Sequence, residues 1–260
     1  MAKINLSIEE KDEMGVEKLY YDGSYLRNNP DWHMSAAPWK TEGILQALER
    51  NHLVPRSICE IGCGAGEILF QLQRHLPACT LEGYDIAPQA IELAKKRENS
   101  QLHVHLGDFL TAPETHDAHY DVILMIDVLE HFEDCFKVLR EIKSKSDYKI
   151  FHLPLDISVF TVVRNELLDF HFATGHLHFF TKDLALQFIR EAGYEILDTF
   201  YTLPPLDTNP WSLNPRRFTR KLIRITKRGL QRLPGNLLYL LNPDLAVRIF
   251  GGWRLMVVAR

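Results

Sequence analysis

The sequence has little of the chemistry that marks zinc-binding, secreted or membrane-spanning proteins. It holds only four cysteines in 260 residues, at positions 59, 63, 79 and 135, and no two of them form a C-x-x-C pair. That spacing disfavours a zinc site, and without a disulfide framework a reducing compartment is expected. No apolar run approaches membrane-spanning length, and residues 1–10 lack the apolar core of a signal peptide. We therefore expect a cytoplasmic protein.

The chain also lacks an overall excess of basic residues. Its formal net charge is -4, so it carries no global signature of a nucleic-acid binder, and we expect a small-molecule partner instead. The apolar content of 46% and the charged content of 25% are typical of a soluble globular protein. At this length the chain can hold one large α/β domain with an insertion.

Residues 57–70 are the stretch around which the rest is organised. Apolar residues 58, 59 and 61 indicate a buried strand, glycines follow at 62, 64 and 66, and apolar residues 68, 69, 72 and 76 have helical spacing. A strand, a glycine turn and a helix form the first unit of nucleotide-binding α/β folds. The glycines permit a sharp turn and close approach of a ligand, and the amides of the helix N-terminus face that ligand.

The glycine spacing separates two classes of such folds. The pattern is G-x-G-x-G, with Glu60 two residues before the first glycine, whereas a dinucleotide fingerprint is G-x-G-x-x-G and would need a glycine where Glu67 stands. An acid there is unfavourable beside a pyrophosphate but harmless beside a cationic cofactor. In these features the sequence resembles the class I S-adenosylmethionine (SAM) dependent methyltransferases, whose first motif is an acid followed by G-x-G-x-G. An ordinary tight turn is the alternative interpretation of the glycines alone.

Two later strands agree with that resemblance. Residues 80–86 predict a second strand, and Asp85 ends it about 20 residues past the glycines, where an acid accepts hydrogen bonds from ribose hydroxyls. Residues 101–109 predict a third strand. The resemblance implies that Asp108 accepts from the adenine amino group and that Phe109 flanks the ring. The alternative is a turn that ends the strand, because Gly-Asp pairs are common in turns.

The most specific match lies in residues 120–132. The apolar run from 120 to 127 predicts a central parallel strand, and D-V-L-E-H-F from Asp127 onwards resembles the fourth-strand motif of ubiquinone-biosynthesis-type O-methyltransferases. Ligands bind at the carboxyl ends of strands in open α/β sheets, so Asp127 and His131 would border the reacting methyl group. The stretch G-H-L-H-F-F-T at 175–181 also resembles this family.

We therefore predict an α/β fold: a seven-stranded, mostly parallel, Rossmann-like sheet with helices on both faces. The expected organisation is an N-terminal arm and lid helix over residues 1–52, a SAM-binding domain over 53–202 and 253–260, and a basic insertion over 203–252. The resemblance implies SAM as cofactor and S-adenosylhomocysteine (SAH) as product. The cofactor-binding residues expected at the glycine turn and strand ends are Glu60, Gly62, Cys63, Gly64, Gly66, Asp85, Ile86, Asp108, Phe109, Ile126 and Asp127.

Methyl transfer from a sulfonium is an in-line displacement, and an oxygen acceptor usually needs a base as well. His131 is the candidate, because an imidazole is neutral at cytoplasmic pH; a purely structural hydrogen bond is its alternative role. No spacing compels a metal site, and none is predicted. The aromatic N-terminal segment is expected either to cap the cleft or simply to pack on the domain. Candidate substrate contacts are Tyr25, Trp32, His33, Trp39, His152, His176 and His178.

Residues 216–232 hold eight basic residues and no acid, which leaves -12 for the rest of the chain. A solvated basic helix, a helix lying on a membrane surface, and a contact with an anionic substrate are the three interpretations. The sequence does not specify the acceptor or the oligomeric state.

The first functional hypothesis is a small-molecule O-methyltransferase. The alternatives are an RNA methyltransferase that grips phosphates with the basic insertion, and a non-enzymatic SAM-binding or membrane-surface protein. An Asn/Asp-Pro-Pro-aromatic motif is missing after the fourth strand, which argues against amino methylation of adenine. A C-x-x-x-C-x-x-C motif is missing too, which excludes a radical SAM enzyme, and the glycine spacing disfavours a dehydrogenase.

Overall fold

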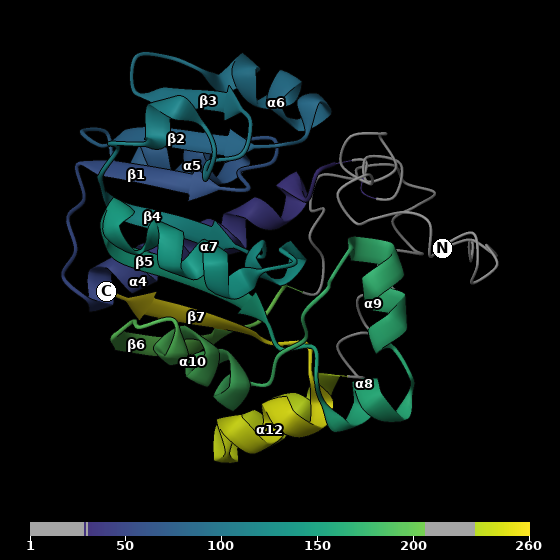
Figure 1. Cartoon of the computed structure of the whole chain (residues 1–260). Coiled ribbons are helices and arrows are strands. Elements are labelled where there is room, and N and C mark those ends of the chain that lie inside the picture. The colour runs from purple at the N-terminus through teal and green to yellow at the C-terminus, as the bar shows by residue number, and fades with distance from the viewer. Residues whose placement is uncertain (1–28, 30, 206–231) are drawn as a thin grey trace, which may run out of the picture.

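The computed structural model describes residues 29, 31–205 and 232–260 (Figure 1). Tyr25 and all but the last residue of the basic segment 216–232 lie outside this part, so the predictions made for them stay predictions. No described helix has both the length and the apolar character needed to cross a bilayer.

The described strands form one sheet in the order β3-β2-β1-β4-β5-β7-β6 (Figure 1). Neighbouring strands are parallel except where β7 pairs antiparallel with β5 and with β6. The prediction of a seven-stranded, mostly parallel sheet is therefore confirmed. The strands are β1 (Ser57–Ile61), β2 (Thr80–Asp85), β3 (Leu102–Leu106), β4 (Tyr120–Ile126), β5 (Ser146–Pro154), β6 (Ile196–Thr202) and β7 (Arg254–Ala259).

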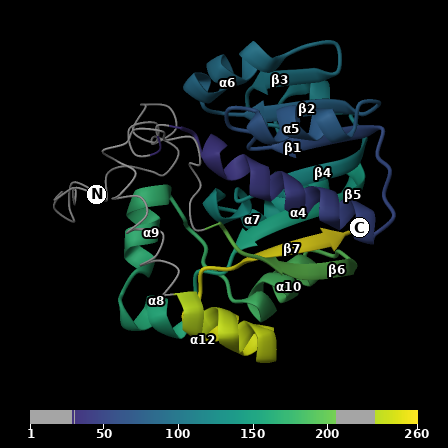
Figure 2. The ribbon, with the colours of Figure 1, turned by 180° about the vertical axis from the view of Figure 1, so that it is seen from behind.

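Helices cover both faces of the sheet, and successive residues of a strand face opposite layers. In β4, Val122 and Leu124 join the core beneath α4, α5 and α6, whereas Ile123 and Met125 join the core beneath α7 and α10. Figures 1 and 2 show α7 and α10 in front of the sheet in one view and α4 in front in the other. These helices are α4 (Ala37–Arg50), α5 (Glu67–His75), α6 (Pro88–Ala94), α7 (Cys135–Ile142) and α10 (Lys182–Glu191).

Helix starts follow the local sequence. Pro88 opens α6 in its first turn, and the Thr181 hydroxyl caps α10 by accepting from the Leu184 amide. Single 3-10 turns lie at η1 (Met34–Ala36), η2 (Lys95–Arg97), η3 (Pro113–Thr115), η4 (Leu129–His131) and η5 (Lys143–Lys145).

The segment between β5 and α10 differs from the expected loop, because it contains α8 (Val159–Val163) and α9 (Leu167–Thr174). Ser158 and Thr161 cap the start of α8 reciprocally. The apolar residues of α9 are not confined to one face of the helix, and no residue of α9 is buried. The sequence therefore has no helical periodicity that would have predicted α9. In the expected insertion, residues 232–241 are helical and α12 (Pro243–Phe250) follows, packed against α8.

The strand order reverses between β1 and β4. At such a switch point the connections leave in opposite directions and open a crevice at the carboxyl ends of the strands. The glycine turn after β1 and the D-V-L-E-H-F segment after β4 both lie there.

Candidate active site

The turn after β1 uses all three of its glycines. Gly62, Gly64 and Gly66 have φ values of 74°, 54° and 70°, a region that residues with a side chain rarely adopt. A Cβ on Gly62 would collide with Val128, and one on Gly66 would lie 3.1 Å from the Cβ of Ala94. A Cβ on Gly64 would meet nothing within 4 Å. The turn is therefore packed at its two ends and open at its centre.

The open side of the turn faces a cavity of about 210 Å³. It brings together residues from β1, β2 and β4 that are far apart in the sequence. Most of the residues predicted to bind the cofactor are in its wall, namely Glu60, Gly62, Cys63, Gly64, Asp85, Ile86, Ile126 and Asp127.

Asp108 and Phe109 are not in the lining of this cavity. The Phe109 ring is buried in the core, with its centroid 5.2 Å from that of Tyr84 and 6.3 Å from that of Tyr120. One carboxylate oxygen of Asp108 accepts from the Leu110 amide. The structure therefore supports the turn interpretation of this Gly-Asp pair. The adenine contact stays a prediction for Asp108, while Phe109 is turned into the core.

Glu60 is a buried carboxyl group whose Oε2 atom has no hydrogen-bond partner among the described residues. Burial raises the pKa of Glu60 to about 8 and outweighs the opposing effect of the Lys40 charge. An orphaned carboxyl group in a cavity wall is costly unless a ligand satisfies it. The cavity therefore suits a ligand with a cationic donor.

Asp85 anchors the middle of the turn. Its Oδ2 accepts from the Gly64 amide at 2.7 Å and its Oδ1 accepts from the Ala87 amide at 2.8 Å. A carboxylate offers about four acceptor positions, so this side chain keeps capacity for a ligand hydroxyl. Glu67, the acid in place of a dinucleotide-type glycine, pairs with Arg97 of η2 at 2.6 Å.

Asp127 lies just beyond the end of β4, with a φ of 52°. Its Oδ2 pairs with Lys40 Nζ at 2.9 Å, and its Oδ1 is 2.8 Å from His152 Nδ1. Burial alone would raise the pKa of Asp127, but Lys40, His152 and Arg254 hold it well below its ordinary value. These contacts over-determine a backbone conformation that costs on the order of 1 kcal/mol or more. Lys40 was not predicted as a site residue, and its only signal in the sequence is its place next to Trp39 in the first helix.

His131 lies in η4, and its Nδ1 is 3.0 Å from the Gly175 carbonyl oxygen. The carbonyl only accepts, so Nδ1 carries the proton and Nε2 carries the lone pair. Burial and the neighbouring His176 lower the pKa of His131 to about 4. The imidazole is therefore neutral at pH 7, as its proposed role as a base requires.

A second cavity, of about 370 Å³, meets the first at His33, Lys40, Asp127 and His131, which are in the walls of both. Its remaining wall comes from segments that the sequence places far apart. They include Trp39, Glu130, Asp156, Thr161, Phe170, His176 and Arg254. Glu130, Asp156 and Arg254 were not predicted, although Glu130 belongs to the D-V-L-E-H-F motif.

The aromatic residues of the N-terminal segment divide between the cavities. Trp32 is in the wall of the first and packs against Ala65, Ala87 and Ala90, while Trp39 is in the wall of the second. The described end of this segment therefore both packs on the domain and contributes to the walls of the cavities, and its role as a lid stays a prediction.

Two of the predicted substrate contacts occupy other positions. His152 is fully buried between Asp127 and Thr202 and is in the lining of neither cavity. His178 Nε2 is 2.9 Å from the Phe132 carbonyl oxygen, and this side chain is in neither lining. Successive residues of β5 point to opposite faces of the sheet, and His152 points into the packed interior on its face. We therefore assign His152 to positioning Asp127 and His178 to holding its loop.

Comparison with known proteins identifies the family. A family model described as a methyltransferase domain matches residues 33–199, which is more than half of the chain. The chain belongs to this methyltransferase-domain family. Demethylmenaquinone methyltransferase of Deinococcus radiodurans is 26% identical over 106 residues, which cover 40% of this chain and 42% of that protein. This methyltransferase chain thus spans less than half of the curated relative it matches.

Solved methyltransferase structures share the fold. Magnesium protoporphyrin IX methyltransferase of Synechocystis, with bound SAH, is 15% identical and has a TM-score of 0.55, over 89% of this chain and 86% of that one. A putative sarcosine dimethylglycine methyltransferase of Galdieria sulphuraria is 18% identical and has a TM-score of 0.58, over 85% and 84% of the two chains. At these identities the likeness is one of fold alone.

The first cavity fits SAM on its own chemistry. The unpartnered Oε2 atom of Glu60 suits the ammonium group of such a ligand, the Asp85 carboxylate suits ribose hydroxyls, and the centre of the glycine turn at Gly64 leaves room for close approach.

Proposed function

We propose that this methyltransferase transfers the methyl group of SAM to an oxygen atom of a small-molecule acceptor. The observation that carries the proposal is the meeting of the two cavities at Asp127 and His131. One cavity has the walls expected for SAM, and the second has the volume of a small-molecule site. An acceptor in the second cavity would face a methyl group held in the first.

Bound SAM supplies a methyl group made electrophilic by its positive sulfur. In the transfer, the acceptor oxygen forms a bond to the methyl carbon as the carbon–sulfur bond breaks, and that electron pair stays on sulfur. The acceptor loses its proton, and the neutral His131 is placed to take it. Trp32 and Trp39 add apolar surface to the walls of the two cavities, and a drier site would favour transfer to the acceptor.

Calorimetric titration of the purified protein with SAH, with NAD as control, tests the cofactor assignment. We expect micromolar SAH binding and no NAD binding, since ~8 kcal/mol of binding free energy is ordinary for a preformed cavity of this kind. Release of SAH during incubation with SAM and candidate phenols, carboxylates and enols then tests the acceptor class. NAD binding with no SAH binding would overturn the proposal.

The same titration should reveal the ionisation of Glu60. With its pKa at about 8, this carboxyl group is mostly protonated at pH 7 in the free protein. The ligand ammonium favours the carboxylate and lowers that pKa, so binding releases close to one proton at pH 7. SAH affinity should therefore rise with pH and level off above about pH 8. Titration in buffers of different ionisation enthalpy measures the proton release, and Glu60→Gln, the isosteric control, should abolish it. Equal release from both proteins would contradict the assignment.

The basic segment 216–232 suggests two alternative functions, and because all but its last residue lie outside the described part of the chain, both stay predictions. RNA as acceptor would make binding fall steeply with salt, because each neutralised phosphate releases counterions. A membrane-surface role would make vesicle binding depend on residues 216–232. We favour the small-molecule acceptor because, in the described part of the chain, a second cavity of about 370 Å³ adjoins the first.

A further inference from the structure

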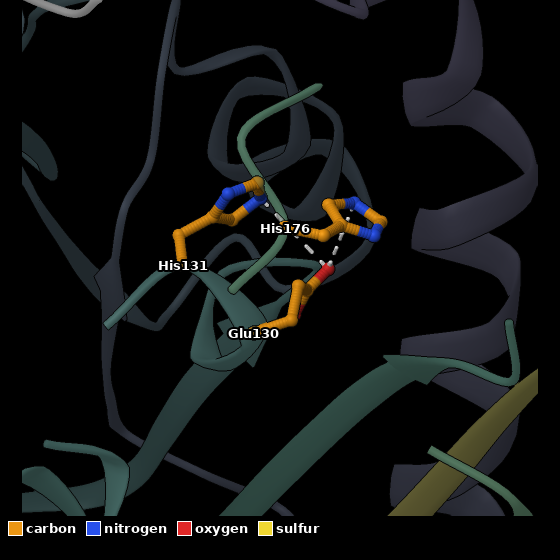
Figure 3. Close-up of side chains that lie close together, drawn as sticks. All are labelled: Glu130, His131 and His176. Atoms are coloured by element: carbon orange, nitrogen blue, oxygen red, sulfur yellow. Dashed lines mark ion pairs between the residues drawn. The ribbon is translucent and has the colours of Figure 1, made fainter. Parts of the chain in front are cut away.

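Three metal-ligand side chains converge in the second cavity. Glu130 and His131 come from η4, after β4, and His176 comes from the loop after α9 (Figure 3). The Nε2 atoms of His131 and His176 each lie 3.9 Å from Glu130 Oε1, and the three ligand atoms lie within 4.8 Å of one another. Figure 3 shows the two imidazoles on either side of the carboxylate.

Both imidazoles are oriented as metal ligands usually are. His131 Nδ1 donates to the Gly175 carbonyl oxygen at 3.0 Å, and His176 Nδ1 lies 2.7 Å from Asp156 Oδ2. An acceptor on Nδ1 fixes the tautomer with its lone pair on Nε2, and a carboxylate there also raises the basicity of the ligand. In both side chains, Nε2 is the atom that faces Glu130.

Glu130 is the second and independent observation. Its side chain is 0% exposed, and neither carboxylate oxygen has a hydrogen-bond partner among the described residues. Its backbone carbonyl oxygen accepts from the amides of Leu177 and His178, so the His176 loop is fixed to this residue. A buried carboxylate with no donor is expensive unless a cation satisfies it.

We propose that Glu130, His131 and His176 bind one divalent transition-metal ion. Two nitrogens and one oxygen favour Zn²⁺, Fe²⁺ or Co²⁺ over Mg²⁺ or Ca²⁺, which prefer ligand sets made entirely of oxygen. Donors about 2.1 Å from one ion lie roughly 3 to 3.5 Å apart, so binding draws these donors together by about 1 Å. Three protein ligands leave positions open toward the second cavity.

The site deepens the proposed function and rests on it. An acceptor oxygen in an open position would be held at the junction of the two cavities, and the ion would lower the pKa of its hydroxyl group. His131 then acts as a ligand, and the ion takes over the activation otherwise assigned to a base. No metal site was predicted from the sequence, because His176 is 45 residues beyond His131 and no short spacing motif joins the two histidines.

Titration of the full-length, chelator-treated protein with Co²⁺ alone tests the site. We expect one equivalent to bind, with visible absorption bands of cobalt bound by nitrogen and oxygen donors, and Zn²⁺ to displace it. His176→Ala should weaken Co²⁺ binding by more than 100-fold, because it removes one of the three ligands and leaves Asp156 without its imidazole partner. Asp156→Asn should weaken it ~10–100-fold. His119→Ala, at an exposed histidine that is in neither cavity lining, is the control and should keep one equivalent.

SAH titration of the metal-free protein keeps the two proposals separable. Intact SAH binding with less than one equivalent of Co²⁺ bound would overturn the metal site and leave the methyltransferase proposal standing. The metal site is equally overturned if His176→Ala binds Co²⁺ as tightly as the parent protein. Because Glu130 is fully buried, substituting it can destabilise the protein, so Co²⁺ binding by a Glu130 variant is interpreted only if its thermal unfolding is unchanged. If it is changed, the His176 variant, at a residue in the cavity wall, provides the test.

Discussion

Replacing Gly64 with valine is expected to abolish SAH binding in a protein that still folds. Gly64 has a φ of 54°, and a Cβ at this position points into open space rather than into the core. The branched side chain would occupy the first cavity against the opposite wall, while its left-handed backbone costs roughly 1–2 kcal/mol of folding free energy. We expect more than ~100-fold loss of SAH affinity, since each 1.4 kcal/mol of lost contact is tenfold.

Gly193→Val is the matched control for backbone strain. Gly193 follows α10 with a φ of 92°, is exposed, and is remote from both cavity linings. Its added Cβ would meet only the end of the flexible Lys143 side chain. The two variants should lose similar free energy of unfolding, measured by urea titration, while only Gly64→Val loses SAH binding. Unchanged SAH affinity in folded Gly64→Val protein would remove the first cavity as the SAM site.

The convergence of the residues proposed to bind the cofactor was predictable because they follow local rules. A glycine turn has few backbone solutions, and acids at the ends of β1, β2 and β4 reach one crevice whenever the strands are parallel and in this order. Glu60, Asp85 and Asp127 therefore converge in the structure as the motif order implies. The same rules failed for Phe109, because a residue just past a strand end turns into the core or the cleft according to loop geometry that spacing does not specify.

The second cavity, where we propose that the acceptor binds, was only partly predictable because it depends on long-range contacts. Lys40 pairs with Asp127 although the two lie 87 positions apart in the sequence. Arg254 approaches the same carboxylate from β7, the last strand in the sequence. No periodicity or short motif encodes such pairs. Three of the histidines predicted as substrate contacts also show that sequence position alone is insufficient. His176 is in the wall of the second cavity, whereas His152 and His178 are not and bond to neighbouring protein groups instead.

The two buried carboxyl groups Glu60 and Asp127 have pKa values that are shifted in opposite directions. Glu60 is uncharged at neutral pH until a cation arrives, while Asp127 stays ionised because Lys40, His152 and Arg254 surround it. Two carboxyl groups in one cleft thus take different roles because their environments move their pKa values apart. The ionised Asp127 fixes the first helix at the junction through Lys40, and it is therefore a positioning group as well as part of the cofactor wall.

His131→Ala is expected to lower methyl transfer by ~10²–10⁴-fold, the usual contribution of a positioned base or its equivalent, while SAH affinity changes little. His131 lies where the two cavities meet, whereas the groups expected to bind the cofactor are on β1 and β2 and in the glycine turn. Loss of its hydrogen bond to Gly175 should cost only about 1 kcal/mol of folding free energy. His119→Ala, at an exposed histidine paired with Asp147, is the control and should keep full turnover.

Turnover, measured as SAH release with an acceptor found by screening, should be compared with the bound metal in the same His131→Ala preparation. Loss of both would identify His131 as a ligand that acts through the ion, because removing one of three donors leaves too weak a site. Loss of turnover with one full equivalent of metal retained would identify it as the base that takes the acceptor proton. Wild-type turnover in folded His131→Ala protein would contradict both roles and leave this histidine only its hydrogen bond to the Gly175 loop.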